Sequence, residues 1–281
     1  MRVIDLMHLG RERVIGCWQV GDVLVDPGPT SCLDTLLGAL DGERPRALLL
    51  THIHLDHAGA SGSLVERWPD LEVYVHERGA RHMADPARLL ESARRLYGDD
   101  MDRLWGDFVA VPESNLRVLQ GGETVPGGFE VAYAPGHASH HVAYRHDGTA
   151  FVGDVGGVRI PPSRFVLPPT PPPDIDIEAW HASIDRIAAW HPERLAITHF
   201  GATEDAAGHL AEMHRRLDEQ AELVHGGDRE SFLERVNRDV AAAGDPDTAA
   251  AYAQAAPRDQ LYAGLERYWR KRSEPAQAPV S

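Results

Sequence analysis

Residues 48–57 read LLLTHIHLDH, an apolar run that ends in three histidines and one aspartate within six residues. The apolar run is typical of a buried strand. The alternation of an extended chain then places His52 and His54 on one side, where both imidazoles could bind one cation. Asp56 and His57 follow where the chain turns into a helix, and they could serve a second cation. Four ligand-type residues at this spacing favour a metal site over a His-rich turn without function.

The composition is that of an acidic globular protein. The chain has 281 residues, of which 43% are hydrophobic and 25% are charged, so it can bury a substantial core. Lys and Arg total 28 against 43 for Asp and Glu, which gives a formal net charge of -15. We expect no nucleic acid partner, because phosphates require a basic surface.

The sequence carries no sign of a membrane segment or a disulfide framework. No apolar run approaches the roughly 18 residues that span a bilayer, and residues 1–10 lack the apolar core of a signal peptide. We therefore expect no membrane partner and a cytoplasmic location. Cys17 and Cys32 are the only cysteines, and we expect both to be buried thiols. The sequence is also compatible with a homo-oligomer.

Ligand-type residues recur after strand-like segments further along the chain. Apolar or alternating runs at residues 129–134, 149–152 and 195–198 are followed by His137, Asp154 and His199, respectively. Functional groups gather at strand ends, where loops approach one another while the strands stay rigid. We therefore expect these residues to meet the opening motif at one rim.

The strand-like segments fall into two halves, residues 1–120 and 121–200, which predicts two stacked sheets with helices outside. Residues 78–105 are helical in pattern and rich in charge, as in an outer layer with a solvated face. After His199 no strand signal remains, so we expect a small helical extension over residues 201–281, with breaks at Gly226-Gly227 and Gly244-Asp245-Pro246. Its polar helical pattern predicts solvated side chains for His209, His214 and His225.

A proline-rich segment lies between the third and the fourth of these strand ends. Residues 161–173 hold too many prolines for either a helix or a strand. The segment is either a stiff loop over the rim or a passive connector, and the sequence supports both interpretations equally.

These motifs resemble those of the metallo-β-lactamase-fold hydrolases. The resemblance rests on Thr-His-Ile-His-Leu-Asp-His at residues 51–57, Pro-Gly-His at 135–137, Val-Gly-Asp at 152–154 and Thr-His-Phe at 198–200. It covers about the first 200 residues. It implies an α+β fold, a four-layer αββα sandwich over residues 1–200, followed by the helical C-terminal extension.

The resemblance also implies a site. In dinuclear members of the family, one metal is held by the residues equivalent to His52, His54 and His137, the other by those equivalent to Asp56, His57 and His199, and Asp154 bridges both. It implies two divalent ions, zinc most of all, with iron or manganese as alternatives. A hydroxide between the metals would be the nucleophile, and Asp56 and Asp154 would be the catalytic carboxylates. The implied reaction is hydrolysis of a thioester, a lactone or a similar small molecule.

Other functions stay open at this point. The helical extension resembles that of glyoxalase II, and Arg159 and Arg164 lie in about the region where that enzyme binds glutathione. Persulfide dioxygenases are similar to glyoxalase II, and such an enzyme would use His52, His137 and Asp154 as a facial triad for a single iron. A nuclease and a non-catalytic scaffold are further alternatives. His140, His141 and Tyr133 are candidate helpers by proximity to His137, although a structural or surface role is favoured for each.

Overall fold

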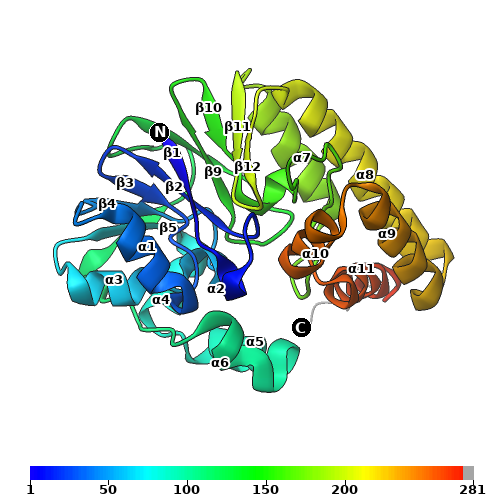
Figure 1. Cartoon of the computed structure of the whole chain (residues 1–281), viewed down its shortest axis with the longest axis horizontal. Helices are drawn as coiled ribbons and strands as arrows, with labels where there is room; N and C mark the ends of the chain where they lie inside the picture. Colours follow the sequence, from blue (N-terminus) through cyan, green and yellow to red (C-terminus); the bar gives the residue numbers. More distant parts are fainter. Residues whose placement is uncertain (275–281) are drawn as a thin grey trace, which may run out of the picture.

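The computed structural model describes residues 1–274 (Figure 1). Two six-stranded sheets face each other, with strand orders β1-β2-β3-β4-β5-β6 and β12-β11-β10-β9-β8-β7. Helices cover the outer face of each sheet (Figure 1). The predicted αββα sandwich and the division of the strands into two halves are thereby confirmed.

The first sheet is parallel from β3 to β6, and β1 and β2 add antiparallel strands at one side. Its central strand β4 is buried on both faces, which explains why its sequence is continuously apolar. The strands are β1 (Arg2–Asp5), β2 (Gly16–Val20), β3 (Val23–Val25), β4 (Ala47–Leu49), β5 (Glu72–His76) and β6 (Leu116–Leu119). The helices of this half are α1 (Leu33–Leu40), α2 (Leu55–Ala58), α3 (Ser61–Arg67), α4 (Glu77–Ala84), α5 (Ala87–Tyr97) and α6 (Met101–Trp105), with 3-10 turns η1 (His8–Gly10), η2 (Thr30–Cys32), η3 (Gly98–Asp100) and η4 (Glu113–Asn115).

The second sheet is antiparallel except where β10 and β11 run parallel. That parallel pair requires a crossover, which η5 (Gly153–Gly156), the proline-rich segment and α7 (Ile177–Ala188) supply. The strands are β7 (Thr124–Val125), β8 (Phe129–Tyr133), β9 (Val142–His146), β10 (Thr149–Phe151), β11 (Arg194–Ile197) and β12 (Gly201–Thr203). Strand β12 contradicts the expectation that no strand follows His199. Its sequence has no strand pattern of its own, and it forms because it pairs with β11.

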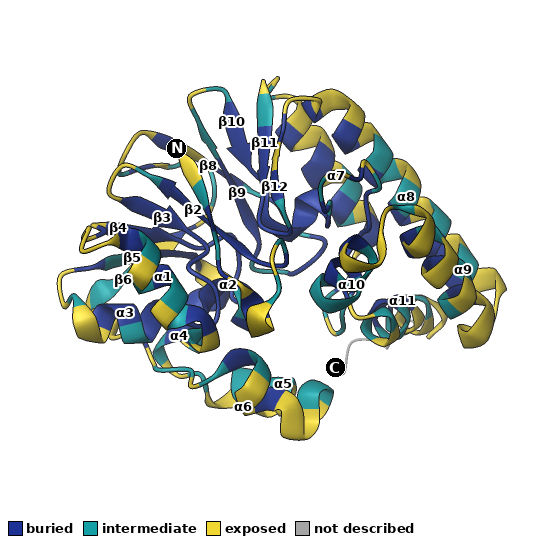
Figure 2. Ribbon diagram, in the orientation of Figure 1, coloured by how far each residue is buried: buried dark blue, intermediate teal, exposed yellow. Residues whose placement is uncertain are grey.

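Most residues of the central strands are buried (Figure 2), and large apolar side chains form a core cluster between the two sheets. Phe129 packs against Tyr144 and Phe151, and Trp18 meets Phe151 edge to face. The Tyr144 hydroxyl donates a hydrogen bond of 2.8 Å to the carbonyl oxygen of Leu50, the residue that precedes the histidine motif. The core thus fixes the end of β4 against the second sheet.

Four helices follow the second sheet: α8 (Ala206–Gly226), α9 (Arg229–Ala242), α10 (Pro246–Ala255) and α11 (Arg258–Ser273). Both predicted breaks are confirmed, and Asp228 and Asp245 cap the helices that restart after them. Helix α11 lies against the proline-rich segment, since a Cβ on Gly264 would be 1.9 Å from the Thr170 carbonyl oxygen. The boundary at residue 200 stays a prediction, and residues 275–281 of the extension lie outside the described residues.

Two further expectations concern cysteines and membranes. Cys17 and Cys32 are both free and buried, as predicted. Within residues 1–274, the helices are either too short or too polar to cross a bilayer.

Candidate metal centre

All seven candidate ligands meet at one rim of the two sheets. His52 and His54 follow β4, Asp56 and His57 lie on α2, and the remaining three come from the second half, as His137 after β8, Asp154 on η5 after β10 and His199 after β11. The rim therefore draws ligands from both sheets. The sequence predicted this convergence, and the structure brings all seven residues together in two groups.

The first group consists of His52, His54, His137 and Asp154. The His54 Nδ1 atom lies 3.0 Å from the Nε2 atoms of both His52 and His137. The Asp154 Oδ2 atom lies 3.3 Å from His137 Nε2 and 4.0 Å from His52 Nε2. Three imidazole nitrogens and one carboxylate oxygen therefore face a common point.

The second group consists of Asp56, His57 and His199, and it faces the other oxygen of Asp154. The Asp154 Oδ1 atom lies 3.2 Å from His57 Nε2 and 3.4 Å from His199 Nε2. The Asp56 Oδ2 atom lies 3.3 Å from His199 Nε2. The two oxygens of one carboxylate thus serve the two groups.

Several of these atoms have no hydrogen-bond partner. Among the described residues, His57 Nε2, His199 Nε2 and Asp154 Oδ1 are buried and unsatisfied. Such atoms carry a desolvation penalty unless something binds them. Neutral imidazoles and carboxylates are ligands that suit zinc, iron and manganese, so the donor set fits two divalent cations.

The electrostatics of the first group match that chemistry, whereas Asp154 and Asp56 outweigh burial at the second group and raise the pKa values of His57 and His199 above the usual value. Burial lowers the pKa of His52 well below its usual range and lowers the pKa of His54 to about 4, which favours the neutral, ligating form. Burial alone would raise the pKa of Asp154. The neighbouring histidines, His57 foremost, outweigh burial and hold the pKa well below its usual range, so this carboxylate is ionised.

The second nitrogen of each of four candidate ligands is also bonded. His57 bonds to the Asp26 Oδ2 atom at 2.8 Å, and the Thr51 Oγ1 atom lies 3.1 Å from the ring of His52. His137 and His199 each bond to one backbone carbonyl oxygen, that of Pro169 at 2.9 Å and that of Val14 at 2.6 Å, respectively. Such bonds fix the ring orientation and the tautomer of a ligating histidine.

Asp26 is the supporting residue that the sequence analysis missed, because it reads as the start of a Pro-Gly turn. It is fully buried at the end of β3. Its carboxylate accepts hydrogen bonds from the hydroxyls of Thr51 and Thr198 and from the Thr51 backbone N–H. The rule that found the ligands, an acid or a histidine directly after a buried strand, also selects Asp26.

The segment that carries Asp154 is held from two helices. The His209 Nε2 atom of α8 bonds to the Gly156 carbonyl oxygen at 2.7 Å, and the Trp180 indole of α7 donates to the Val155 carbonyl oxygen at 3.1 Å. The prediction that His209 is solvated was wrong, since only 4% of this residue is exposed. A polar helical pattern does not reveal that α8 turns this side chain toward η5.

The other histidines outside the seven ligands have structural surroundings. His214 pairs with His181 and Asp185 and is half-buried, whereas His225 is exposed and stacks on Trp269. His141 is fully buried and stacks on His52, and neither of its ring nitrogens has a hydrogen-bond partner among the described residues. His140 accepts a weak hydrogen bond of 3.4 Å from the Ile53 backbone. Tyr133 donates its hydroxyl to the Ser139 carbonyl oxygen and stacks on His76.

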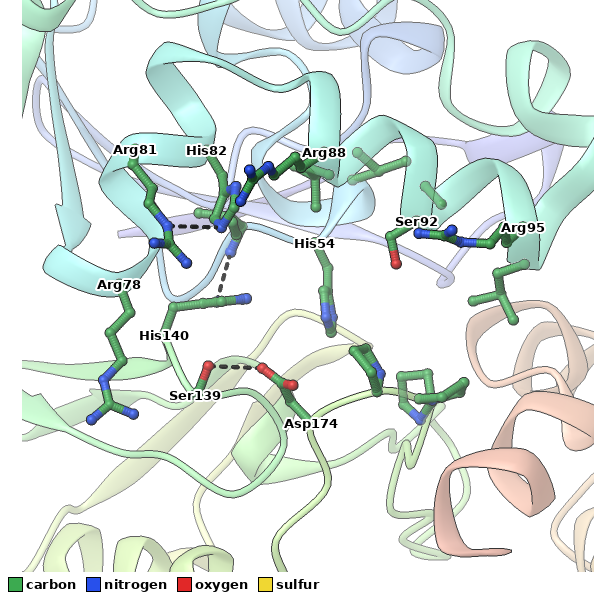
Figure 3. Close-up of a pocket in the computed structure, with 18 of the residues that line it drawn as sticks. His54, Arg78, Arg81, His82, Arg88, Ser92, Arg95, Ser139, His140 and Asp174 are labelled. Atoms are coloured by element: carbon green, nitrogen blue, oxygen red, sulfur yellow. Dashed lines mark hydrogen bonds between the residues drawn. The ribbon is translucent and has the colours of Figure 1, made fainter. Parts of the chain in front are cut away.

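Two cavities open onto the ligands. The larger, of about 860 Å³, has His54 in its wall (Figure 3). The smaller, of about 100 Å³, is lined by Asp56, Asp154 and His199. Prolines of residues 161–173 line both, which supports the interpretation of this segment as a loop over the rim. Arg159 and Arg164 line neither cavity, so the expected glutathione-binding region does not face this site.

Comparisons with known proteins agree with this architecture. A curated metallo-beta-lactamase fold-containing protein, ST1585 of Sulfurisphaera tokodaii, is 26% identical over 221 residues, which are 75% of this chain and 81% of that protein. A hydroxyacylglutathione hydrolase of Xanthomonas euvesicatoria is 33% identical over 135 residues. That match spans 47% of this chain and only 40% of the hydrolase.

Solved structures share the fold. The crystal structure of ST1585 from Sulfolobus tokodaii superposes with a TM-score of 0.63 at 23% identity, over 78% of this chain and 85% of that one. TTHA1623, described in a di-iron-bound form, superposes with a TM-score of 0.52 at 30% identity, over 72% of this chain and 93% of that one.

A family model decides the assignment. The model described as the metallo-beta-lactamase superfamily matches residues 21–199, and this span contains all seven candidate ligands and the supporting Asp26. More than half of the chain is covered. This chain therefore belongs to the metallo-beta-lactamase superfamily, as its motifs predicted.

Proposed function

We propose that this protein is a dinuclear metal-dependent hydrolase that cleaves a thioester, a lactone or a similar carboxylic derivative of a small molecule. One observation carries the proposal: the two carboxylate oxygens of Asp154 face two separate ligand groups at 3.2 to 3.4 Å from their nearest nitrogens. A mononuclear site would leave one of these groups buried without a partner.

His52, His54 and His137 would hold one metal, Asp56, His57 and His199 the other, and Asp154 both. Zinc suits this donor set, and iron or manganese are alternatives, with a di-iron form described for the similar TTHA1623. The chemistry that two divalent ions would supply there is polarisation of a carbonyl oxygen and a lower pKa for a water molecule, toward neutrality.

The chain's own residues orient and enclose the reaction. Asp56, with 19% of its side chain exposed, and Asp154 line the smaller cavity and place negative charge beside it. In hydrolysis, the water oxygen bonds to the acyl carbon, the bond to the leaving group breaks, and that group departs with the electron pair. A thiolate or an enolate-like group needs no proton to leave, whereas an alkoxide does, so a leaving group of low pKa requires no general acid at this site.

The cavity beside His54 supports a small molecule as the substrate, since about 860 Å³ lies in the range of small-molecule sites. The formal net charge of -15 speaks against a nucleic acid substrate.

Elemental analysis of freshly purified protein tests the proposal, followed by a panel of esters, thioesters, lactones and phosphodiesters on the same sample. We expect two metal ions per chain and cleavage of a carboxylic derivative. A single ferrous ion per chain, together with oxygen uptake on a persulfide, would overturn the proposal in favour of an iron dioxygenase. A fully metal-loaded protein that cleaves nothing in the panel would also contradict it.

A further inference from the structure

A cluster of arginines lines the larger cavity. We call it the arginine wall, and its members are Arg78 and Arg81 on α4, Arg88 and Arg95 on α5, and Arg267 on α11. Figure 3 shows Arg78, Arg81, Arg88 and Arg95 around the cavity that also contains His54. The wall therefore borders the candidate metal centre directly.

The charge of the wall is largely uncompensated. Within residues 1–274, Arg78, Arg81 and Arg88 have no carboxylate within ion-pair distance, and Arg267 bonds only to the Pro173 carbonyl oxygen. Arg95 pairs with Glu91 at 3.1 Å on the exposed surface of α5. The cavity lining contains two acids, Glu77 and Asp174. Asp174 accepts a hydrogen bond from Ser139, and Glu77 accepts one from Gln120. The cavity lining thus has five arginines and two acids, so its charge is locally positive in a protein whose formal net charge is -15.

Such a concave basic surface attracts anions. The guanidinium group offers a planar fork of donors that fits phosphate and carboxylate oxygens. Because the five guanidinium groups come from three helices around one cavity, they fit an anion with several charged groups better than a single carboxylate.

We propose that the substrate carries phosphate groups on its leaving group and that the arginine wall binds them. This inference rests on the proposed hydrolase function and names its substrate class, an acyl thioester of a phosphorylated thiol. The step balances as ordinary hydrolysis: water adds its oxygen to the acyl carbon, the C–S bond breaks, and the thiolate leaves with the electron pair of that bond. One proton of the water goes to the thiolate, and the other is released as the carboxylic acid ionises to the carboxylate.

The position of the two cavities sets the orientation of the substrate. His54, Tyr97 and Pro171 line both, so the cavities meet at these residues. The smaller cavity of about 100 Å³ has apolar residues such as Leu104 and Leu261 in its wall beside the candidate ligands, and it takes the acyl group. The acyl carbon then lies at the ligands, and the leaving group extends into the larger cavity toward the arginines.

The first experiment compares three thioesters with the same acetyl group on the metal-loaded protein. The thiols are coenzyme A, which carries phosphates, glutathione, which carries carboxylates, and N-acetylcysteamine, which is neutral. We expect the coenzyme A thioester to have a kcat/KM about 10-fold or more above that of the neutral thioester, and this advantage to shrink as salt is added.

The matching variants are the double substitution Arg81→Ala with Arg88→Ala and the control Arg94→Ala. Arg94 is an exposed arginine of the same helix α5 and does not line the cavity. We expect the double variant to raise KM for the coenzyme A thioester about 20-fold with kcat nearly unchanged, and to leave the neutral thioester unaffected. The control should behave like the wild type.

A second readout does not depend on hydrolysis. Calorimetry measures binding of the S-methyl thioether of coenzyme A to the same proteins, and we expect the double variant to bind it about 20-fold more weakly. Loss of binding in the double variant would support the wall even if no thioester is cleaved, in which case only the proposed hydrolase function fails. Equal KM values for all thioesters in the wild type and the double variant would overturn the wall while the hydrolase stands. A glutathione thioester preferred over the coenzyme A thioester would overturn the assignment of phosphate.

Discussion

Two regions that border the larger cavity differ in burial and in how firmly their side chains are held. One is the metal floor, by which we mean the seven candidate ligands and Asp26, and its histidines His52 and His57 are completely buried. The other is the arginine wall, whose side chains project from helix surfaces with few bonds to neighbours. The floor is held by both sheets and by a layer of supporting hydrogen bonds. Reaction chemistry thus depends on preorganised residues, whereas recognition can change on exposed ones without disturbing the fold.

The largest effect should come from Asp154→Ala, since this carboxylate faces both ligand groups. We expect loss of both metals and a fall in kcat of about 1000-fold or more. Asp56→Ala should lower metal occupancy less, because Asp56 contacts one group only. Elemental analysis of both variants is the measurement. Equal metal loss in the two would contradict the bridging role of Asp154.

Asp26→Asn tests whether the floor depends on its supporting layer. The substitution weakens the bond to His57 Nδ1 without removing a ligand. We expect metal affinity or activity to fall about 10- to 100-fold. Asp22→Asn is the control, because Asp22 forms an exposed ion pair with Arg46 at the start of the same strand region. Metal titration of both variants is the measurement. If Asp26→Asn bound metal with the wild-type affinity, Asp26 would not support the metal site.

Gly264→Ala probes the helix that carries Arg267 of the wall. The added Cβ would lie 1.9 Å from the Thr170 carbonyl oxygen, so α11 must shift away from the proline-rich segment. We expect a loss of about 2 to 3 kcal/mol in the free energy of unfolding. Gly38→Ala in α1 is the matched control, since its Cβ would meet no atom within 4 Å. Thermal unfolding should show Gly38→Ala at or above the wild-type Tm, and a similar result for Gly264→Ala would refute the close approach.

His209 makes the support of the floor sensitive to acid. Burial lowers the pKa of His209 from 6.5 to about 4. The unfolded chain therefore binds a proton more readily than the folded one, and the stability from this residue is intact above pH 6.5 and falls as the pH drops toward 4. We expect His209→Gln to reduce the acid-induced loss of unfolding free energy by about 2 kcal/mol.

Denaturant titrations at pH 7 and pH 4.5 measure this difference. His225→Gln, an exposed histidine on the same helix, should retain the full acid loss. An acid loss in His209→Gln equal to that of the wild type would show that folding does not lower the pKa of His209.

The smallest effect is expected on the wall. Glu91 pairs with Arg95 at 3.1 Å on the exposed surface of α5. Glu91→Gln should change the free energy of unfolding by less than about 0.5 kcal/mol, because exposed ion pairs contribute little. It should also leave Arg95 free for an anion and lower KM for a phosphorylated thioester about 2-fold. If Glu91→Gln lowered the free energy of unfolding as much as Gly264→Ala does, the wall would contribute to the fold, and its contrast with the metal floor would be wrong.

This contrast also explains what the sequence could predict. The seven candidate ligands follow buried strands, and the apolar runs that mark such strands are visible in the sequence. Asp26 follows a strand in the same way, but its Pro-Gly successor gives it the pattern of an ordinary turn. The residues of the metal floor can therefore be predicted from local sequence patterns that recur along the chain.

The arginine wall cannot be predicted in this way. The residues of α4 and α5 read as a solvated outer layer, which is true of their exposure, yet their arginines border a cavity that exists only because α11 and the proline-rich segment lie opposite. Helix α7 was also not anticipated, although Asp176 caps its start and Ile177, Trp180 and Ile184 form its buried face. The long proline-rich segment before it masked that pattern. Only the tertiary arrangement places these helices against the rim.

The two buried thiols bear on how this protein can be handled at the bench. Burial raises the pKa of Cys32 to about 11 and raises the pKa of Cys17 further, so neither forms a thiolate near neutral pH. Disulfide reagents that report a released thiol will therefore give little background signal from the folded protein. A cysteine introduced at an exposed position in the wall of the larger cavity, as in Ser92→Cys, would be labelled selectively, and a fluorophore there would report on the entry of a ligand beside α5.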